Sequence, residues 1–200
     1  MPLKILGRTT SINVRKVLWT CAELDLSFEH VEKDDALLAH NPNAMVPVIQ
    51  DGDFVLWESN AICRYLAGQH PRSTLLPEDA HARALVDQWM DWQATELNAS
   101  WRYAFLALVR RSPDHTQARD IAASIASWHR HMRMVDEHLA RGGQFITGEF
   151  FTLADVVIGL ATHRWLVSPI ERPHLDSLLG YYQRLSVRPA FRAHVDPRVP

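Results

Sequence analysis

Residues 45–62, MVPVIQDGDFVLWESNAI, constrain the fold more than any other part of this 200-residue chain. Two short apolar runs flank the Asp-Gly-Asp sequence at 51–53, a pattern typical of a β-hairpin. Ser59 then provides a favourable helix N-cap, and Ile62 and Leu66 follow at helical spacing. The stretch therefore predicts a strand, a tight turn, a second strand and the start of a helix.

The residues before this hairpin alternate between strand and helix signals. Residues 3–6, LKIL, form a short apolar run, and apolar residues recur at helical spacing over 13–24. Residues 27–33 alternate with period two, and residues 34–42 allow about two helical turns before an Asn-Pro pair. We therefore expect the order β-α-β-α-β-β-α over residues 1–70.

The pattern changes after residue 70. Residues 71–78 contain two prolines and are interpreted as a linker. Beyond it, helical spacing dominates, and a capping-box sequence, Thr-Leu-Ala-Asp, stands at 152–155. Further helices are expected over 79–111, 115–140, 174–186 and 188–194. The prediction is an α+β domain at 1–70 and an all-helical domain at 79–200.

Composition excludes several classes of protein. Lys and Arg number 21 against 23 Asp and Glu, with no long basic run, which argues against nucleic acid or an anionic membrane as the main partner. The only cysteines, Cys21 and Cys63, make neither a disulfide framework nor a metal-ligand pattern. No apolar run reaches the roughly 18 residues of a membrane span, and no signal peptide is recognisable. We therefore expect a cytoplasmic, globular protein without a bound metal.

Two features of the hairpin need an explanation beyond folding. Pro47 removes a backbone donor from a strand, and a cis Val46–Pro47 bond would turn the polar groups of Val46 outward. Glu58 and Ser59 lie at a helix N-terminus, where backbone N–H groups favour a carboxylate. Together they suit the α-amino-acid end of a small peptide. An ordinary capped helix after a hairpin remains the alternative reading of these residues.

The stretch NPNAMVPVIQDGDFVLWESNAICRYLA at 41–67 resembles the cytosolic glutathione S-transferases. So does GEFFTLAD at 148–155, and the resemblance covers essentially the whole chain. It is strongest to bacterial-looking, serine-type members of theta and phi character. The resemblance implies a thioredoxin-like domain followed by an all-α domain, glutathione as co-substrate with no other cofactor, and a homodimer.

The resemblance also implies where glutathione binds. Its γ-glutamyl end would lie on Glu58 and Ser59, and its cysteinyl backbone would pair with Val46 beside cis-Pro47. Two departures affect the glycine end of glutathione.

The loop before the Val-Pro pair carries Ala44 where the family usually has glycine. The segment 33–42, between the second strand and this loop, is also shorter than is usual in the family. Lys33 and His40 are the basic candidates left there for the glycine carboxylate.

The sulfur of glutathione is expected near residues 7–17. Ser11 and Arg15 match the S-x-x-x-R of the serine-type classes, so Ser11 is the first candidate to stabilise the thiolate. Thr10 and Asn13 are the alternatives, and an N-cap role for Ser11 alone also stays open. A hydroxyl donor at a helix N-terminus lowers the pKa of a thiol by favouring its anion. Cys21 and Cys63 are expected to be inert.

The second substrate is expected to be a small hydrophobic electrophile. Trp101 and Phe105 share a helix face and are the candidates for its pocket, although a core role fits them equally well. The predicted reaction is conjugation of the glutathione thiolate. Two alternatives remain: a glutathione-dependent disulfide reductase or peroxidase without a protein cysteine, and a non-catalytic ligand-binding or interaction protein.

Overall fold

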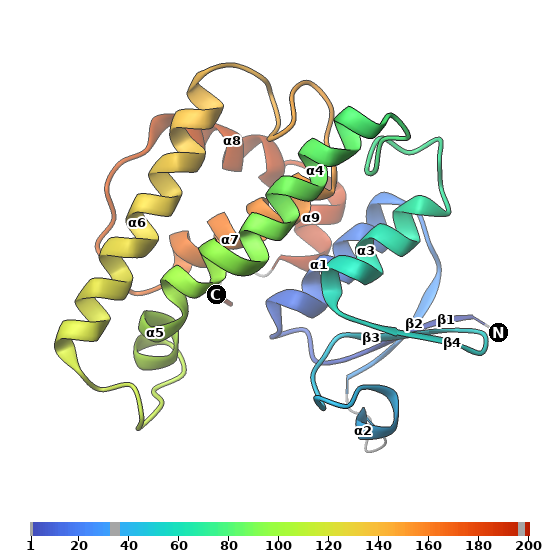
Figure 1. The fold of residues 1–200 in the computed structure, drawn as a ribbon, viewed down its shortest axis with the longest axis horizontal. Coiled ribbons are helices and arrows are strands. Elements are labelled where there is room, and N and C mark those ends of the chain that lie inside the picture. Colours follow the sequence, from blue (N-terminus) through green and yellow to red (C-terminus); the bar gives the residue numbers. More distant parts are fainter. Residues whose placement is uncertain (1, 33–36, 196–198) are drawn as a thin grey trace.

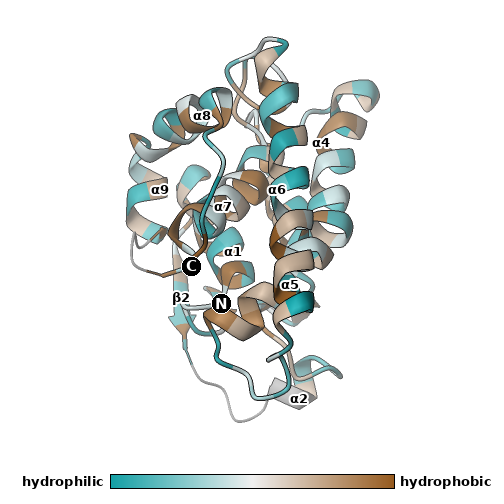
Figure 2. Ribbon diagram, turned by 90° about the vertical axis from the view of Figure 1, so that its left-hand side faces the viewer, coloured by the Kyte–Doolittle hydropathy of each residue, from teal (hydrophilic) through white to brown (hydrophobic). Residues whose placement is uncertain are grey.

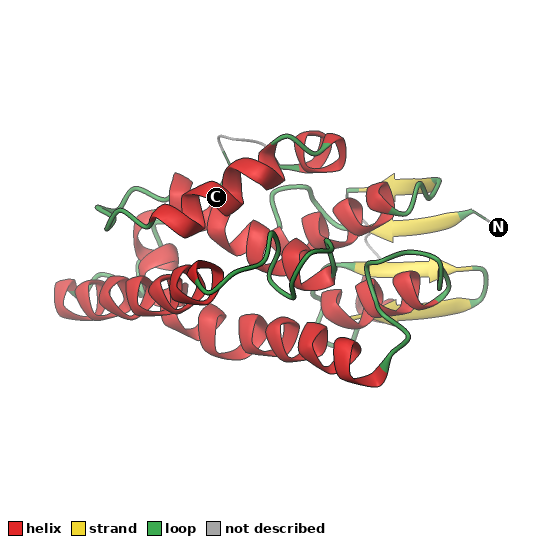
Figure 3. Ribbon diagram, turned by 90° about the horizontal axis from the view of Figure 1, so that it is seen from above, coloured by secondary structure: helices red, strands yellow, loops and turns green. Residues whose placement is uncertain are grey.

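A computed structural model describes residues 2–32, 37–195 and 199–200. A four-stranded sheet with the order β2-β1-β3-β4 forms one end of the molecule (Figure 3). Its strands are β1 (Leu3–Leu6), β2 (Phe28–Val31), β3 (Val48–Asp51) and β4 (Phe54–Trp57). β1 pairs with β2 in parallel and with β3 antiparallel, and β3 and β4 form the expected hairpin.

Helices cover both faces of this sheet. α1 (Ile12–Glu23) and α3 (Ser59–Gly68) lie side by side on one face, and the single turn α2 (Leu37–His40) lies on the other (Figure 1). α1 forms because apolar residues recur every three or four positions, and Val14, Val17, Leu18 and Cys21 are all buried. The predicted order β-α-β-α-β-β-α and the thioredoxin-like fold are confirmed.

The rest of the chain is helical. Its helices are α4 (Ala80–Trp92), the π-helix η1 (Gln93–Leu97), α5 (Asn98–Leu108), α6 (Ala118–Ala140), α7 (Leu153–Val167), α8 (Asp176–Ser186) and α9 (Pro189–His194). α7 lies between α9 and α6, whereas outer helices such as α4 and α8 alternate hydrophilic and hydrophobic residues (Figure 2). Nearly every residue of α7 is buried, which explains its continuous apolar sequence. The predicted all-α second part is confirmed.

Three local predictions differ from the structure. Ser59 is the first residue of α3 and not its N-cap, because Glu58 occupies the N-cap position with a φ of 74°. The helix expected over 34–42 is one turn, and residues 33–36 lie outside the described residues. The helix expected over 79–111 contains the π-helix η1. Hydrophobic spacing carries no signal for such a local change of helix type.

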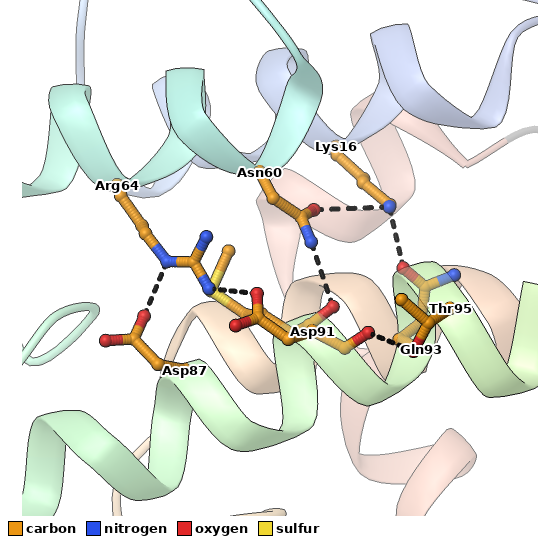
Figure 4. Close-up of polar contacts among 8 residues, drawn as sticks. Lys16, Asn60, Arg64, Asp87, Asp91, Gln93 and Thr95 are labelled. Carbon is orange, nitrogen blue, oxygen red and sulfur yellow. Dashed lines mark hydrogen bonds and ion pairs between the residues drawn. The ribbon is translucent and has the colours of Figure 1, made fainter.

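α1 joins the two parts of the molecule. The Trp19 side chain is fully buried and lies 5.6 Å from the ring of Phe151 and 5.1 Å from that of Phe191. Polar contacts also link α1 and α3 to α4 and η1, among them a hydrogen bond from Lys16 to Gln93 (Figure 4). The division into domains at 1–70 and 79–200 stays a prediction.

Candidate active site

The strand register brings several loops to one edge of the sheet. β1, β2 and β4 end at this edge and β3 begins there, because Leu6 lies opposite both Val31 and Val48, and Val48 lies opposite Trp57. Continuing the register by two residues places 7–8, 46–47 and 58–59 next to one another. Segments far apart in the sequence therefore meet at this edge, as expected for a site built on loops.

Gly7 lets the loop after β1 pass close to the loop before β3. Its φ is 135°, and a Cβ atom there would lie 2.6 Å from Val14 Cγ2 and 2.7 Å from Val46 Cβ. No other residue fits this space and conformation without a shift of its neighbours. The Val46–Pro47 peptide bond that follows is cis, as the sequence led us to expect.

The first turn of α1 faces the same edge. Ser11 occupies the N-cap position, yet its hydroxyl makes no capping hydrogen bond, and its backbone N–H donates to the carbonyl of Arg8 at 3.0 Å. Ser11 and Asn13 both line the cavity described below, whereas Thr10 is exposed and does not. The structure thus brings two of the three predicted thiolate partners to the cavity.

The N-terminus of α3 lies at the neighbouring strand end. Ser59 is buried and Glu58 is exposed, and neither side chain has a hydrogen-bond partner in the part of the chain that the structure describes. Glu58 has φ 74° and ψ 112°, which is uncommon for a residue other than glycine. Neither residue lines the cavity, so they form a separate polar position beside it.

A cavity of about 470 Å³ opens between this sheet edge and the helical part of the molecule. α1, α5 and α7 each contribute to its wall. Its described lining residues are Leu6, Gly7, Arg8, Ser11, Ile12, Asn13, Glu32, Ala44, Met45, Val46, Phe105, Arg110 and Arg164. The wall therefore combines an apolar surface with several charged side chains.

The two predicted aromatic residues differ in position. Phe105 lines the cavity. Trp101 does not: it packs in the core against Phe105 and Trp128, with ring centroids 5.4 and 5.9 Å apart. The structure thus favours the core role that the sequence also allowed for Trp101, and its assignment to an electrophile pocket stays a prediction.

Three arginines of the lining escaped the sequence analysis. Arg164 of α7 is buried, and its guanidinium carbon lies 4.2 Å from the centroid of the Phe105 ring; that of Arg110 lies 5.4 Å from it. Burial, together with the nearby Arg15 and Arg110, lowers the pKa of Arg164 to about 9. The sequence did contain one signal for Arg164: a charged residue inside the apolar stretch 153–167 requires a polar or charged partner.

The loop before β3 is held by Asn41. Its side chain donates to the Met45 carbonyl at 2.8 Å and accepts from the Asn43 amide at 3.0 Å. Ala44 in this loop has a φ of 50°, a conformation that favours glycine. This agrees with the family resemblance, which implies glycine at this position.

Of the two basic candidates for the glycine carboxylate, His40 does not line the cavity. The Gln50 side-chain amide donates to a ring nitrogen of His40 at 3.1 Å, and His40 is half-buried beside β3. Lys33 lies outside the described residues. Both assignments stay predictions.

The cysteines lie away from the cavity. Burial raises the pKa of Cys21 to about 12 and that of Cys63 to about 11, and both side chains are fully buried. A buried thiol with a raised pKa holds almost no thiolate near neutral pH. Nucleophilic chemistry through a protein cysteine is therefore disfavoured.

Residues 2–32, 37–195 and 199–200 contain no group of three or more His, Cys, Asp or Glu side chains arranged to hold a metal ion. Among them, no helix is long and apolar enough to cross a bilayer.

Comparison with known proteins gives concordant matches. A family model described as "Glutathione S-transferase, N-terminal domain" matches residues 6–74. The chain is 34% identical over 196 residues to glutathione S-transferase GstB of Escherichia coli K12, covering 93% of this chain and 94% of that protein. It is 33% identical over 129 residues to human glutathione S-transferase theta-1, covering 62% of this chain and 53% of that protein.

Solved structures agree with these matches. The theta class glutathione S-transferase from Xanthomonas axonopodis pv. citri with glutathione bound superposes with a TM-score of 0.88 and 38% identity, and 98% of each chain is covered. Poplar glutathione transferase F1 has a TM-score of 0.87 at 22% identity, with 99% of this chain and 98% of that chain covered, which shows the shared fold.

Proposed function

The chain belongs to the glutathione S-transferase family of enzymes, and we propose that it joins the glutathione thiolate to an electrophilic carbon in the cavity of about 470 Å³. The sulfur forms a bond to that carbon as the leaving group departs with its electron pair. Catalysis rests on activation of the nucleophile and on its alignment with the second substrate.

The position of Ser11 carries this proposal. Its hydroxyl lines the cavity at the N-terminus of α1 and has no partner among the described residues. A thiol placed there receives a hydroxyl hydrogen bond and the positive end of the helix dipole, and both favour the thiolate. Each unit by which the thiol pKa falls corresponds to about 1.4 kcal/mol in favour of the anion. Asn13, which also lines the cavity, is the second candidate.

Glutathione would span the shared sheet edge. In this proposal its cysteinyl backbone pairs with Val46 beside Pro47, and its γ-glutamyl end meets Glu58 and Ser59. The free Glu58 carboxylate suits an ammonium group, and the α3 N-terminus with the Ser59 hydroxyl suits a carboxylate. The glutathione bound in the similar Xanthomonas axonopodis enzyme supports glutathione as the ligand.

Exchange of Ser11 for Ala tests the proposal. Without the hydroxyl, the pKa of bound glutathione should rise and turnover should fall by more than about tenfold. The KM for glutathione should change little, because the ends of the tripeptide are held elsewhere. Thiolate ultraviolet absorbance, titrated against pH with glutathione bound, and conjugation kinetics measure the two effects.

Thr10→Ala is the matched control, since it removes a neighbouring hydroxyl that does not line the cavity. Unchanged turnover in Ser11→Ala would reject Ser11 and transfer the role to Asn13. Efficient disulfide or peroxide reduction with negligible conjugation would instead favour a glutathione-dependent reductase or peroxidase. Failure to bind millimolar glutathione would favour a ligand-binding role.

The remaining expectations follow from the family. A homodimer and a cytoplasmic location are typical of it and stay predictions for this chain. The apolar surface of Phe105, Ile12 and Met45 supports an electrophile with a hydrophobic body.

A further inference from the structure

The cavity carries more positive charge than a purely hydrophobic substrate requires. Arg8, Arg110 and Arg164 line it, and Glu32 is the one carboxylate among its described lining residues. The Glu32 carboxylate accepts a hydrogen bond from the Thr9 hydroxyl at 3.1 Å. Within residues 2–32, 37–195 and 199–200, no Asp or Glu forms an ion pair with any of the three arginines.

Arg164 is the most informative of the three. Only 3% of it is exposed, and its Nε atom is buried without a hydrogen-bond partner among the described residues. Among the described residues, a terminal nitrogen of Arg164 donates to the main-chain oxygen of Pro200 at 3.4 Å, a long distance for such a bond. A buried guanidinium with no Asp or Glu partner and one long hydrogen bond among the described residues can be stabilised further by an anion that reaches it.

A second guanidinium approaches the same place. Arg110 and Arg164 both lie against the Phe105 ring, at 5.4 and 4.2 Å from its centroid. The two like charges repel each other, and an anion bound in the cavity that both residues line offsets that repulsion. Burial and the neighbouring arginines Arg15 and Arg110 also lower the pKa of Arg164.

We infer that the second substrate of this enzyme is an organic anion, a carboxylate attached to a small apolar body. This inference rests on the proposed conjugation and specifies its substrate class. The apolar body contacts Phe105, and the carboxylate meets Arg110 and Arg164.

The charge of the reaction explains why such a site needs cations. The nucleophile is a thiolate, so an anionic electrophile approaches it against Coulomb repulsion. Guanidinium groups beside the electrophile offset that repulsion in the ground state and in the transition state.

A matched pair of electrophiles tests the inference: 4-chloro-3,5-dinitrobenzoate and its neutral carboxamide, 4-chloro-3,5-dinitrobenzamide. In both, the thiolate sulfur forms a bond to the carbon that bears chlorine, and chloride leaves with the bonding electrons. The thiol proton passes to solvent. Each kcat/KM is divided by the rate of the uncatalysed reaction with glutathione, which removes the difference in intrinsic reactivity.

Arg110→Gln is the principal variant, because Arg110 is exposed and its exchange does not threaten the core. We expect the normalised kcat/KM of the wild type to favour the benzoate. Arg110→Gln should lower kcat/KM for the benzoate by about tenfold and for the benzamide by less than about twofold, the scale of one charge-assisted hydrogen bond. Arg102→Gln removes an exposed arginine of α5 that does not line the cavity, and should change neither rate.

Arg164→Gln should show the same selective loss. Because Arg164 is buried, the kinetics of the Arg164→Gln variant are compared only after thermal unfolding confirms that this variant folds. The test with Arg110→Gln does not depend on the Arg164 variant.

Several results would overturn the inference. Equal losses for benzoate and benzamide would make Arg110 a general positioning residue. A raised KM for glutathione with unchanged benzoate kinetics would mean that the arginines bind a carboxylate of glutathione itself. A wild type that prefers the benzamide would exclude an anionic substrate while leaving conjugation intact. No turnover of either compound would overturn both the inference and the proposed reaction.

Discussion

Lys16 of α1 is charged, and yet only 1% of it is exposed. Its Nζ donates to Gln93 Oε1 at 2.7 Å and to Asn60 Oδ1 at 3.3 Å, which connects α1 to α3 and to η1 (Figure 4). Burial lowers the pKa of this ammonium from 10.5 to about 8. Hydrogen bonds to neutral amides offset only part of the free energy of removing the charge from water.

This pKa predicts a particular pH dependence of stability. The native pKa lies below that of the unfolded chain, so between pH 8 and 10.5 the unfolded state binds more protons than the native state. The free energy of unfolding contributed by Lys16 therefore rises with pH across this window. Relative to Lys16→Met, the wild type should gain roughly 2–3 kcal/mol between pH 7.5 and 10.5.

Urea denaturation at a series of pH values measures this difference. Lys4→Met, at a half-buried position of β1 whose side chain is 39% exposed, is the control. Parallel pH profiles for the wild type and Lys16→Met would contradict the prediction.

At the scale of the element, the start of α7 does more than cap a helix. The Asp155 carboxylate is fully buried and accepts from the backbone N–H groups of Thr152 and Ile146, each at 2.8 Å, and from the Tyr181 hydroxyl at 3.1 Å. The sequence predicted the contact with Thr152 as a capping box. The contacts with Ile146 and Tyr181 also tie the preceding loop and α8 to the start of α7. Burial raises the pKa of this carboxyl to about 6.

Asp155→Ala should therefore be strongly destabilising. It leaves two buried N–H groups without partners, so we expect a loss of about 3–5 kcal/mol at pH 8, where the carboxyl of the wild type is ionised. Chemical denaturation measures the loss. Asp120→Ala removes an exposed carboxylate from the first turn of α6 and should stay within about 0.5 kcal/mol of the wild type. Equal effects of the two exchanges would contradict this role of Asp155.

At the scale of the whole molecule, α7 is the helix against which both parts of the chain pack. Gly159 lies where α1 and α8 approach it most closely: a Cβ atom there would be 2.6 Å from Leu185 Cδ1 and 3.1 Å from Trp19 Cη2. Trp19 and Leu185 are both fully buried, so neither side chain has open space to move into. The absence of a side chain at Gly159 therefore sets the distance between the two parts.

Gly159→Ala should weaken this packing. Although Ala favours a helix over Gly, we expect a net loss of about 1–3 kcal/mol from overpacking. Gly180→Ala is the matched control, since the nearest atom to its added Cβ lies 3.6 Å away in the same helix. It should be neutral or stabilising by up to about 1 kcal/mol. Thermal unfolding of both variants gives the comparison, and a Gly159→Ala variant as stable as Gly180→Ala would show that α7 can shift.

Local features of this fold follow from the sequence because they depend on residues close together in the chain. The hairpin at 51–53, the capping box at 152–155 and the order of strands and helices are all of this kind, whereas the cis bond at Val46–Pro47 was implied by the family resemblance. The separate signals at 46–47 and 58–59 also indicated one peptide-binding edge, once their resemblance to a family was recognised.

The wall of the cavity depends on contacts between distant residues, and only the tertiary structure decided it. Trp101 and Phe105 share a helix face, but Trp128 and Arg164 pack against Trp101, so Phe105 alone of the two reaches the cavity. Arg110 and Arg164 are 54 positions apart in the sequence and meet at one ring. Helical periodicity identifies which face is buried, but it carries no information about the chain that covers that face.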